Sequence, residues 1–569
     1  MPAATVEPQL RAAIDLLNQG RAAEAGEALR ALLRTSPDIP QAHYLLAVAC
    51  RLRGDSTGAR TALSIALELQ PDFQEAALDI ARLLNTLGEH GECVAVTTAA
   101  AAVARPLEPL LVERARAFQA LGLHEQRLAE RERIVRLYPA KPNAYHNLAA
   151  ALGDVGLPED AERAARQAID RGGNAPETWL VLARALQSQN RLDEAERAFA
   201  EAVRRRPGFA PALRDWSQLV WMRTGDLDRS LSVLNAGVGT NSLAELTAAK
   251  ARLFEAAGHP ALGYDTLVGR GGSSGPDSEL MAARLAIGFD AGLALRHARR
   301  AEQMAPTSPA VQRQLIDACL AAGEPAAALT SVEHLLDADP FDQGLIASRW
   351  MAWRMLGDDR ARRLYDYRTM VVAQPIDTPA GWATLADYLA ELSEYLRGLH
   401  GFRTHPVDQS LRHGSQTSAN LMKIDHPLLS AFRHAVDRPI REYLAAIGEG
   451  SDALRSRNTG GYRFAGMWSV KLSPGGFHVG HVHPQGWISS ACYIDLPPAI
   501  GTATHDGWLQ FGEPGIPTYP PLEPEWRIQP ADGVLALFPS FMWHSTAPFG
   551  GDRPRLTIAF DIVPSPVAG

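Results

Sequence analysis

The chain has 569 residues, of which 46% are hydrophobic and 21% are charged, and its 56 Lys and Arg against 64 Asp and Glu give a net charge of −8. These values exclude wholesale disorder, and the length exceeds what one compact core accommodates, so we expect at least two domains. Because there is no basic excess, the composition also excludes the electrostatic footprint of a nucleic-acid partner or of an anionic membrane surface.

Cysteine usage and the N-terminal residues bear on the cellular compartment. The four cysteines lie far apart with no CxxC pair, which argues against a zinc ribbon or a disulfide framework. Residues 1–11 lack the basic and apolar segments of a signal peptide, and the chain contains no apolar stretch of 18 residues. We therefore expect a cytoplasmic protein that does not span a membrane.

Glycines recur at a fixed interval in the first part of the chain. A step of 34 residues separates five of them: Gly20, Gly54, Gly88, Gly122 and Gly156. Asn190 occupies the next position, and prolines recur at about one, two or three times the same interval as far as Pro375. Glycine accepts the left-handed backbone at the end of a helix, and proline cannot continue a helix interior. The pattern therefore predicts pairs of helices with a tight turn at each glycine.

These helix pairs resemble tetratricopeptide repeats, which share the 34-residue period, the small residues at helix contacts and the closing proline. About ten or eleven repeats occupy residues 1–375, which predicts an all-α superhelical solenoid. The resemblance implies a concave groove that binds a peptide or a protein, whereas the alternative is a structural solenoid without a ligand. Four tryptophans are either contacts for such a partner or core residues: Trp216, Trp221, Trp350 and Trp353.

The pattern changes after residue 375. Helical patterns continue at residues 382–399 and 428–447, so we expect residues 376–460 to form a helical connector or support. In residues 461–569, short β-branched and aromatic runs are bounded by Gly and Pro, which is typical of an antiparallel barrel or jelly roll. The expected fold class is thus multidomain α + β, with the helical solenoid first and the barrel last.

Histidines are concentrated near the C-terminal end of the chain. His481 and His483 lie two residues apart, so a regular strand points both side chains to one face and His478 to the other. His544 follows a buried strand that ends at Pro539. Two ligands from one strand and a third from a distant one are typical of a facial metal site with open coordination positions.

A second polar group lies on the last strand-like run. Arg555, Thr557 and Ala559 share one face of this run because side chains alternate along a strand. A guanidinium that points into a barrel is suited to bidentate capture of a carboxylate. We therefore expect Arg555 and Thr557 to anchor a dicarboxylate co-substrate beside the metal.

The segments HVHPQGWISSACYIDLP, LALFPSFMWHSTAPF and RLTIAF resemble the 2-oxoglutarate and Fe(II)-dependent oxygenases, as does GSQTSANL at residues 414–421. The resemblance implies a double-stranded β-helix of the jelly-roll or cupin type. It also implies a bound Fe(II) ion, with 2-oxoglutarate and O2 as co-substrates for the hydroxylation of a C–H bond. His481 and His544 match the family's two histidine ligands, and Arg555 with Thr557 matches the pair that holds 2-oxoglutarate.

The motif match also brings Tyr493 and Ser489 toward the co-substrate. Contact with 2-oxoglutarate and ordinary strand packing with a hydroxyl partner are equally consistent with the sequence at these two positions.

His483 departs from the family pattern, because most members have Asp or Glu there. Either His483 replaces the carboxylate as the third metal ligand, or it contacts the ligands without binding the metal and water fills the third coordination position. Aspartyl β-hydroxylase-like enzymes lack the carboxylate, and we expect His481, His483 and His544 to form the catalytic metal site.

A solenoid that binds extended chains, joined to a hydroxylase-type barrel, predicts an oxygenase that hydroxylates a peptide or protein side chain. Two alternatives remain at this point: an oxygenase that acts on a small molecule or a glycan, and a scaffold protein with a degenerate metal-binding barrel. The chain contains no GxGxxG or GxxxxGK[ST] phosphate loop and no GxSxG elbow, so other common chemistries find no support.

Overall fold

The computed structural model describes residues 6–237, 243–269, 275–501 and 504–565. The chain divides into two compact units, Met1–Ala185 and Leu186–Gly569, each of which is described by itself. None of the described helices is long and apolar enough to cross a membrane.

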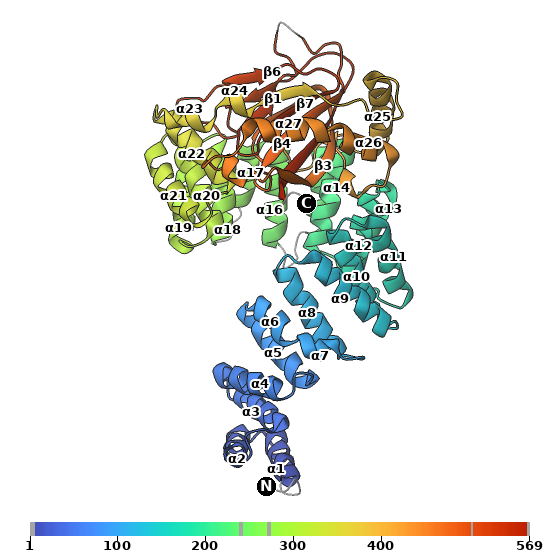
Figure 1. The fold of residues 1–569 in the computed structure, drawn as a ribbon, viewed down its shortest axis with the longest axis vertical. Helices are drawn as coiled ribbons and strands as arrows, with labels where there is room; N and C mark the ends of the chain where they lie inside the picture. Colours follow the sequence, from blue (N-terminus) through green and yellow to red (C-terminus); the bar gives the residue numbers. More distant parts are fainter. Residues whose placement is uncertain (1–5, 238–242, 270–274, 502–503, 566–569) are drawn as a thin grey trace. The chain divides into compact units, whose positions relative to one another are not determined.

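The first unit consists of paired helices (Figure 1). Its helices are α1 (Val6–Asn18), α2 (Ala22–Thr35), α3 (Pro40–Leu52), α4 (Ser56–Leu69), α5 (Gln74–Leu87), α6 (His90–Val96), α7 (Thr98–Ala102), α8 (Glu108–Ala120), α9 (His124–Leu137), α10 (Pro142–Asp154), α11 (Pro158–Asp170) and α12 (Pro176–Ser188), the last of which crosses the boundary between the units.

The turns between paired helices lie where the glycine spacing predicts them. The φ angles of Gly88 and Gly156 are 78° and 74°, a left-handed conformation that glycine adopts without strain. Asn190, in the same position of the next repeat, has a φ of 60°, and asparagine is the residue that best replaces glycine there. The predicted helix-turn-helix period is confirmed at these positions.

The second unit begins with further helix pairs and continues into shorter helices. Its helices are α13 (Leu192–Arg205), α14 (Ala210–Thr224), α15 (Leu227–Asn235), α16 (Leu243–Ala256), α17 (Pro260–Val268), α18 (Pro276–Ile287), α19 (Ala291–Met304), α20 (Pro309–Ala321), α21 (Pro325–Ala338), α22 (Gln343–Met355), α23 (Arg360–Leu364), α24 (Tyr367–Met370), α25 (Leu385–Leu399), α26 (Pro427–Ala435) and α27 (Asp437–Ile447). Three-residue 3-10 helices lie at Leu421–Lys423 and Arg455–Arg457.

One helix expected from the sequence is in fact two. The pattern at residues 428–447 predicts a single helix, but α26 ends at Ala435 and α27 begins at Asp437. Pro439 has no N–H to donate to the carbonyl oxygen of Ala435, four residues earlier. The backbone N–H of Asp377 donates to that oxygen instead, at 3.0 Å, and Val436 forms a turn between the two helices.

The strands form one antiparallel sheet that curves into a nearly closed barrel, whose first strand is yellow and whose later strands are orange to red in Figure 1. Its strands are β1 (Val372–Pro375), β2 (Leu411–Gln416), β3 (Gly461–His481), β4 (Ile488–Asp495), β5 (Leu509–Phe511), β6 (Trp526–Ile528), β7 (Val534–Pro539), β8 (His544–Thr546) and β9 (Arg555–Ser565). The order is β1-β7-β4-β9-β3-β8-β5-β6, and β2 pairs with β3 beside this path. The expected jelly-roll type of barrel is confirmed.

Two strands of the barrel precede residue 461, where the sequence places the first strand. β1 pairs with β7, and β2 pairs with β3, so segments upstream of residue 461 contribute to the sheet. The helices α25 and α27 cover the sheet, since α25 contacts β4 and α27 contacts β1 and β7. One hydrophobic core contains buried residues from both the helices and the strands, the first being Ala283 in α18 and the last Ile562 in β9. The domain boundaries at residues 375 and 460 therefore stay predictions, and this hydrophobic core includes residues from all three of the predicted segments.

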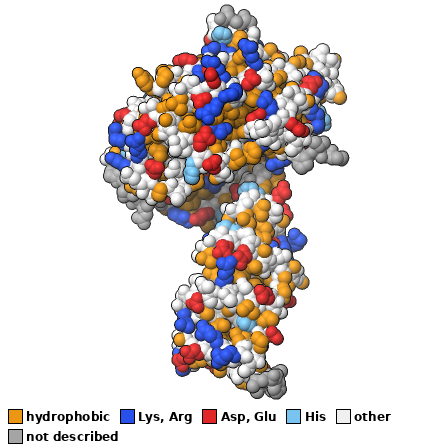
Figure 2. All heavy atoms as spheres, turned by 60° about the vertical axis from the view of Figure 1, so that its left-hand side comes forward, with side chains coloured by type: hydrophobic (Ala, Val, Ile, Leu, Met, Phe, Trp, Pro, Cys, Tyr) orange, Lys and Arg blue, Asp and Glu red, His pale blue; other side chains and the backbone are white. Residues whose placement is uncertain are grey.

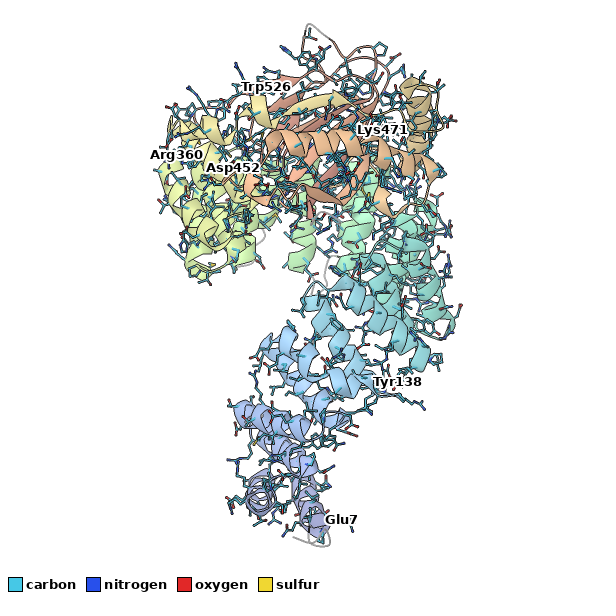
Figure 3. All side chains as sticks on the ribbon, viewed as in Figure 1. Glu7, Tyr138, Arg360, Asp452, Lys471 and Trp526 are labelled. Atoms are coloured by element: carbon cyan, nitrogen blue, oxygen red, sulfur yellow. The ribbon has the colours of Figure 1, made fainter. Side chains whose placement is uncertain are left out.

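Trp350 and Trp353 lie within this core, whereas Trp221 is buried in α14, where its Nε1 donates to the carbonyl oxygen of His405. Trp526, labelled in Figure 3, stacks on Tyr367 with ring centroids 6.2 Å apart. On the face drawn in Figure 2, Lys and Arg side chains are interspersed with Asp and Glu. This mixture agrees with the absence of a basic excess in the composition.

Candidate metal centre

Three histidines converge at one end of the barrel. His481 is the last residue of β3, His483 lies in the loop that follows, and His544 is the first residue of β8. The antiparallel pairing of β3 with β8 sets His481 directly opposite His544. One ring nitrogen from each of the three lies within 4.8 Å of the others. The structure thus brings together the three histidines that the sequence selects as metal ligands.

Each of these rings is oriented by a hydrogen bond from its Nδ1. The acceptors are the carbonyl oxygen of Val479 for His481 at 2.9 Å, and that of Met542 for His544 at 2.9 Å. His483 uses the carboxylate of Asp561, at 2.6 Å from its Nδ1. An acceptor at Nδ1 places the proton of a neutral imidazole there and leaves the Nε2 lone pair free. All three rings therefore have the tautomer that coordinates a metal through Nε2.

The protonation states of His481 and His544 also suit a metal. Burial lowers the pKa of His481 to about 3 and that of His544 well below its ordinary value. Neutral imidazoles are good ligands for divalent transition ions, and Fe(II) is one of these. Three of them on one side of a cavity leave the remaining coordination positions open. The donor set therefore fits the Fe(II) ion that the family resemblance implies.

His478 is not where strand alternation predicts it. A regular β3 would turn His478 away from the other histidines, yet its ring stacks on that of His481 with centroids 5.5 Å apart and lines the same cavity. The pairing of β3 with β8 shifts register between His478 and His481, so the alternation of faces is broken there. The expectation that His478 faces away was wrong. Its Nδ1 lies 3.0 Å from the Ser410 hydroxyl.

The histidines open onto a cavity of about 350 Å³. Its walls are formed by β2, β3, β4, β5, β7, β8 and β9, so it occupies the interior of the barrel. Residues that line it besides the histidines include Gln416, Trp468, Gln485, Arg555, Thr557 and Asp561. Trp487, by contrast, is buried in the core, where its Nε1 donates to the Leu454 carbonyl oxygen.

Arg555 enters this cavity as a buried cation. The residue is 3% exposed, and its Nη1 donates to the Gly507 carbonyl oxygen at 2.7 Å. Its Nε has no partner among the described residues, and none of their carboxylates forms an ion pair with it. Burial lowers the pKa of the guanidinium from its usual value. A buried cation without a counter-charge is costly unless a ligand supplies one, and a carboxylate of 2-oxoglutarate would do so.

Tyr493 and Ser489 are both fully buried, and neither is among the described residues that line the cavity. The Arg555 guanidinium lies over the Tyr493 ring at 5.1 Å, and the Tyr493 hydroxyl has no partner among the described residues. Ser489 donates to Asp561 Oδ1 at 2.7 Å and lies 2.8 Å from the Ser540 hydroxyl. The predicted co-substrate contacts of these two residues stay predictions.

Asp561 is the site residue that sequence reasoning missed. It lies on the same face of β9 as Arg555, Thr557 and Ala559, two residues further along, and it lines the cavity with them. The alternation that selects Arg555 and Thr557 would have selected Asp561 as well. An acidic residue inside an otherwise apolar run was the available signal.

The comparisons with known proteins agree with this geometry. Residues 466–561 match the family described as "Putative 2OG-Fe(II) oxygenase", and residues 10–72, 146–211 and 180–244 match the tetratricopeptide repeat family. Both resemblances are confirmed. The oxygenase match covers β3 to β9 almost completely and includes His481, His483, His544 and Arg555.

Several solved structures are similar to the chain. One is a tetratricopeptide repeat protein from Parabacteroides merdae, with 14% identity over 48% of this chain and 97% of that chain and a TM-score of 0.36. Another is YrrB, described as a TPR protein with an unusual peptide-binding site, with 14% identity over 33% of this chain and 98% of that one and a TM-score of 0.31. The search of curated proteins found no match.

Proposed function

We propose that the protein is an Fe(II) and 2-oxoglutarate-dependent oxygenase that hydroxylates a side chain of a peptide or protein recruited by the repeats. The observation that carries the proposal is the convergence of one ring nitrogen from each of three histidines, together with the buried Arg555 on the same cavity, which has no carboxylate partner among the described residues. When bound, Fe(II) and 2-oxoglutarate would couple the oxidative decarboxylation of 2-oxoglutarate to hydroxylation, with succinate and CO2 as the other products.

The side chains around the cavity have distinct roles in this proposal. His481, His483 and His544 hold the metal through Nε2 and leave coordination positions for 2-oxoglutarate and O2. Arg555 binds the distal carboxylate of 2-oxoglutarate, with the Thr557 hydroxyl on the same wall. The buried side chains around them, including Phe538 and Leu509, exclude water from the reacting atoms.

A second cavity supports an extended substrate. It measures about 570 Å³, is lined in part by residues 513–518 and 521–523, and shares His478 and Thr546 with the first cavity, so the two cavities adjoin at these residues. A small molecule bound at the metal would leave most of this second space empty, whereas a peptide would occupy both.

The four cysteines are all free and buried, in keeping with the cytoplasmic location that we propose.

Turnover tests the enzymatic part of the proposal. We expect succinate formation that requires Fe(II), 2-oxoglutarate and O2, and that disappears in His544→Ala. His434→Ala is the matched control, because His434 is an exposed helical histidine whose Nδ1 contacts the Ser430 carbonyl oxygen outside the barrel interior. Protein purified without oxygen that retains no Fe(II) and forms no succinate would favour the scaffold alternative.

Substrate class needs a separate measurement. Peptides captured from a digest by the full chain should gain the mass of one oxygen atom when Fe(II), 2-oxoglutarate and O2 are added. His544→Ala should capture the same peptides without modifying them, because the histidine lies in the barrel and not in the repeats. Uncoupled succinate formation without any captured peptide would instead point to a small molecule or a glycan.

A further inference from the structure

The carboxylate of Asp561 lies beside the candidate metal centre and has no role in the proposed function. Its Oδ1 accepts hydrogen bonds from His483 Nδ1 at 2.6 Å and from the Ser489 hydroxyl at 2.7 Å. Asp561 is buried, with its side chain 12% exposed, and it lines the cavity that contains the histidines. Asp561 is not one of the three residues whose ligand atoms converge, and its hydrogen bond to this group is the one to His483.

The surrounding loop fixes this contact. The His483 backbone N–H donates to the Ser540 carbonyl oxygen at 3.0 Å, and the Ser540 hydroxyl lies 2.8 Å from that of Ser489. Gly486 closes the turn by donating its N–H to the His483 carbonyl oxygen at 3.1 Å. A Cβ at position 486 would overlap the Ser540 hydroxyl and lie 3.4 Å from Asp561 Cγ, so the turn packs directly against the carboxylate. Backbone and side chain of His483 are thus held from opposite sides.

We infer that Asp561 is a positioning residue of the metal centre, which supplies through His483 the negative charge that the ligand set lacks; this inference rests on the proposed function. Three neutral imidazoles leave an Fe(II) centre with its full double charge, whereas the usual two-histidine, one-carboxylate set halves it. A carboxylate hydrogen-bonded to a ligating imidazole raises the basicity of that imidazole and fixes its orientation. In this protein the carboxylate would act through its hydrogen bond to His483 and would not bind the metal itself.

The alternative is that Asp561 only satisfies buried hydroxyl and imidazole donors and stabilises the fold. The two roles differ in what they do to metal affinity. Asp561→Asn keeps the size of the side chain and an acceptor oxygen but removes the charge. If the charge acts on the metal, the variant loses affinity while the fold persists. If the role is structural, the loss appears in stability and not in the affinity of the folded protein.

The experiment is a titration of the full chain with Fe(II) under nitrogen, and with Co(II), whose visible absorption reports the coordination. We expect Asp561→Asn to raise the Kd about 10- to 100-fold, the range typical for the loss of a partner that orients a metal ligand. Asp495→Asn is the matched control. Asp495 is a partly buried carboxylate of the same sheet that pairs with Arg397 and Arg553 and does not line the cavity. It should leave the Kd unchanged.

A double-mutant cycle separates action through His483 from any other effect. In the His483→Ala background, Asp561→Asn should cause no further loss of affinity, because the connecting imidazole is gone. Equal losses in both backgrounds, or no loss in either, would overturn the inference while leaving the proposed function intact. Failure of the wild-type chain to bind either ion would overturn the proposed function itself. If Asp561→Asn does not fold, Ser489→Ala takes its place, with a smaller loss in the same direction expected and no loss overturning the inference.

Discussion

Replacement of Arg555 by Met should separate ligand binding from stability, because the two respond in opposite directions. Arg555→Met keeps the length and apolar stem of the side chain but removes the guanidinium. Arg555 is buried, its guanidinium donates to one carbonyl oxygen, that of Gly507, and it forms no ion pair with a carboxylate among the described residues. Its main role is therefore expected toward a ligand and not toward the fold.

The magnitudes follow from these contacts. A hydrogen bond to a charged group contributes about 1.5–3 kcal/mol, which corresponds to ~10- to 150-fold in the Kd for 2-oxoglutarate. On the stability side, the Gly507 carbonyl oxygen loses a donor, at a cost of about 1 kcal/mol. Removal of a buried, uncompensated cation offsets that cost, since such a charge is expensive to desolvate. We expect the Tm of the ligand-free variant to be unchanged or raised.

The assay is thermal unfolding of the full chain with and without 2-oxoglutarate, together with a direct titration of 2-oxoglutarate in the presence of a divalent metal. The wild type should gain stability with 2-oxoglutarate, and Arg555→Met should gain little at the same concentration. Arg463→Met, an exposed arginine on β3, is the control and should behave as the wild type. An unchanged Kd in Arg555→Met would refute the anchor role, and a large fall in Tm without ligand would show that Arg555 supports the fold.

Three further predictions concern the metal and the surroundings of the site. Chelation of the anaerobic protein should abolish succinate formation, and Fe(II) should restore it more completely than Zn(II); full activity after chelation would argue against a metal-dependent reaction. Tyr365→Phe removes the hydroxyl that bonds the Phe541 carbonyl oxygen and the Trp543 N–H, so urea unfolding should show a loss of about 1–3 kcal/mol. Gly480→Ala would place a Cβ 2.5 Å from the Glu513 carbonyl oxygen and should lower the free energy of unfolding by about 1–3 kcal/mol. In the control Gly91→Ala, the added Cβ in α6 meets nothing within 4 Å, so this variant should not be destabilised.

The repeats could be predicted from sequence because their signals are local. A helix pair closed by a left-handed residue depends on neighbours within one repeat, and the glycine spacing locates those residues directly. Asn190 shows that the signal survives a substitution, since its φ of 60° matches the glycines it replaces. The principal strands were also predictable, because β4, β7 and β9 are the apolar runs beginning near Ile488, Val534 and Arg555. Each of these runs is bounded by residues that end strands.

The parts that were missed depend on pairing between distant segments. β1 is four residues long and has no sequence pattern of its own; it is a strand because it pairs with β7, more than 150 residues later in the chain. The position of His478 likewise depends on a register shift against β8 that no alternation rule within β3 contains. Asp561 differs from both, since the alternation along β9 already placed it on the cavity face.

Long-range packing also explains why the last repeats and the barrel are difficult to separate. Trp350 of α22 stacks on Tyr365 with ring centroids 4.1 Å apart, and the Tyr365 hydroxyl holds the backbone at Phe541 and Trp543. His544 follows immediately, so a continuous chain of contacts leads from a repeat helix to a candidate metal ligand. Because a close-packed interior transmits displacements, we expect a change at Trp350 or Tyr365 to disturb the backbone next to His544. The contacts that support the candidate metal site therefore extend to α22, upstream of the change in sequence pattern at residue 375.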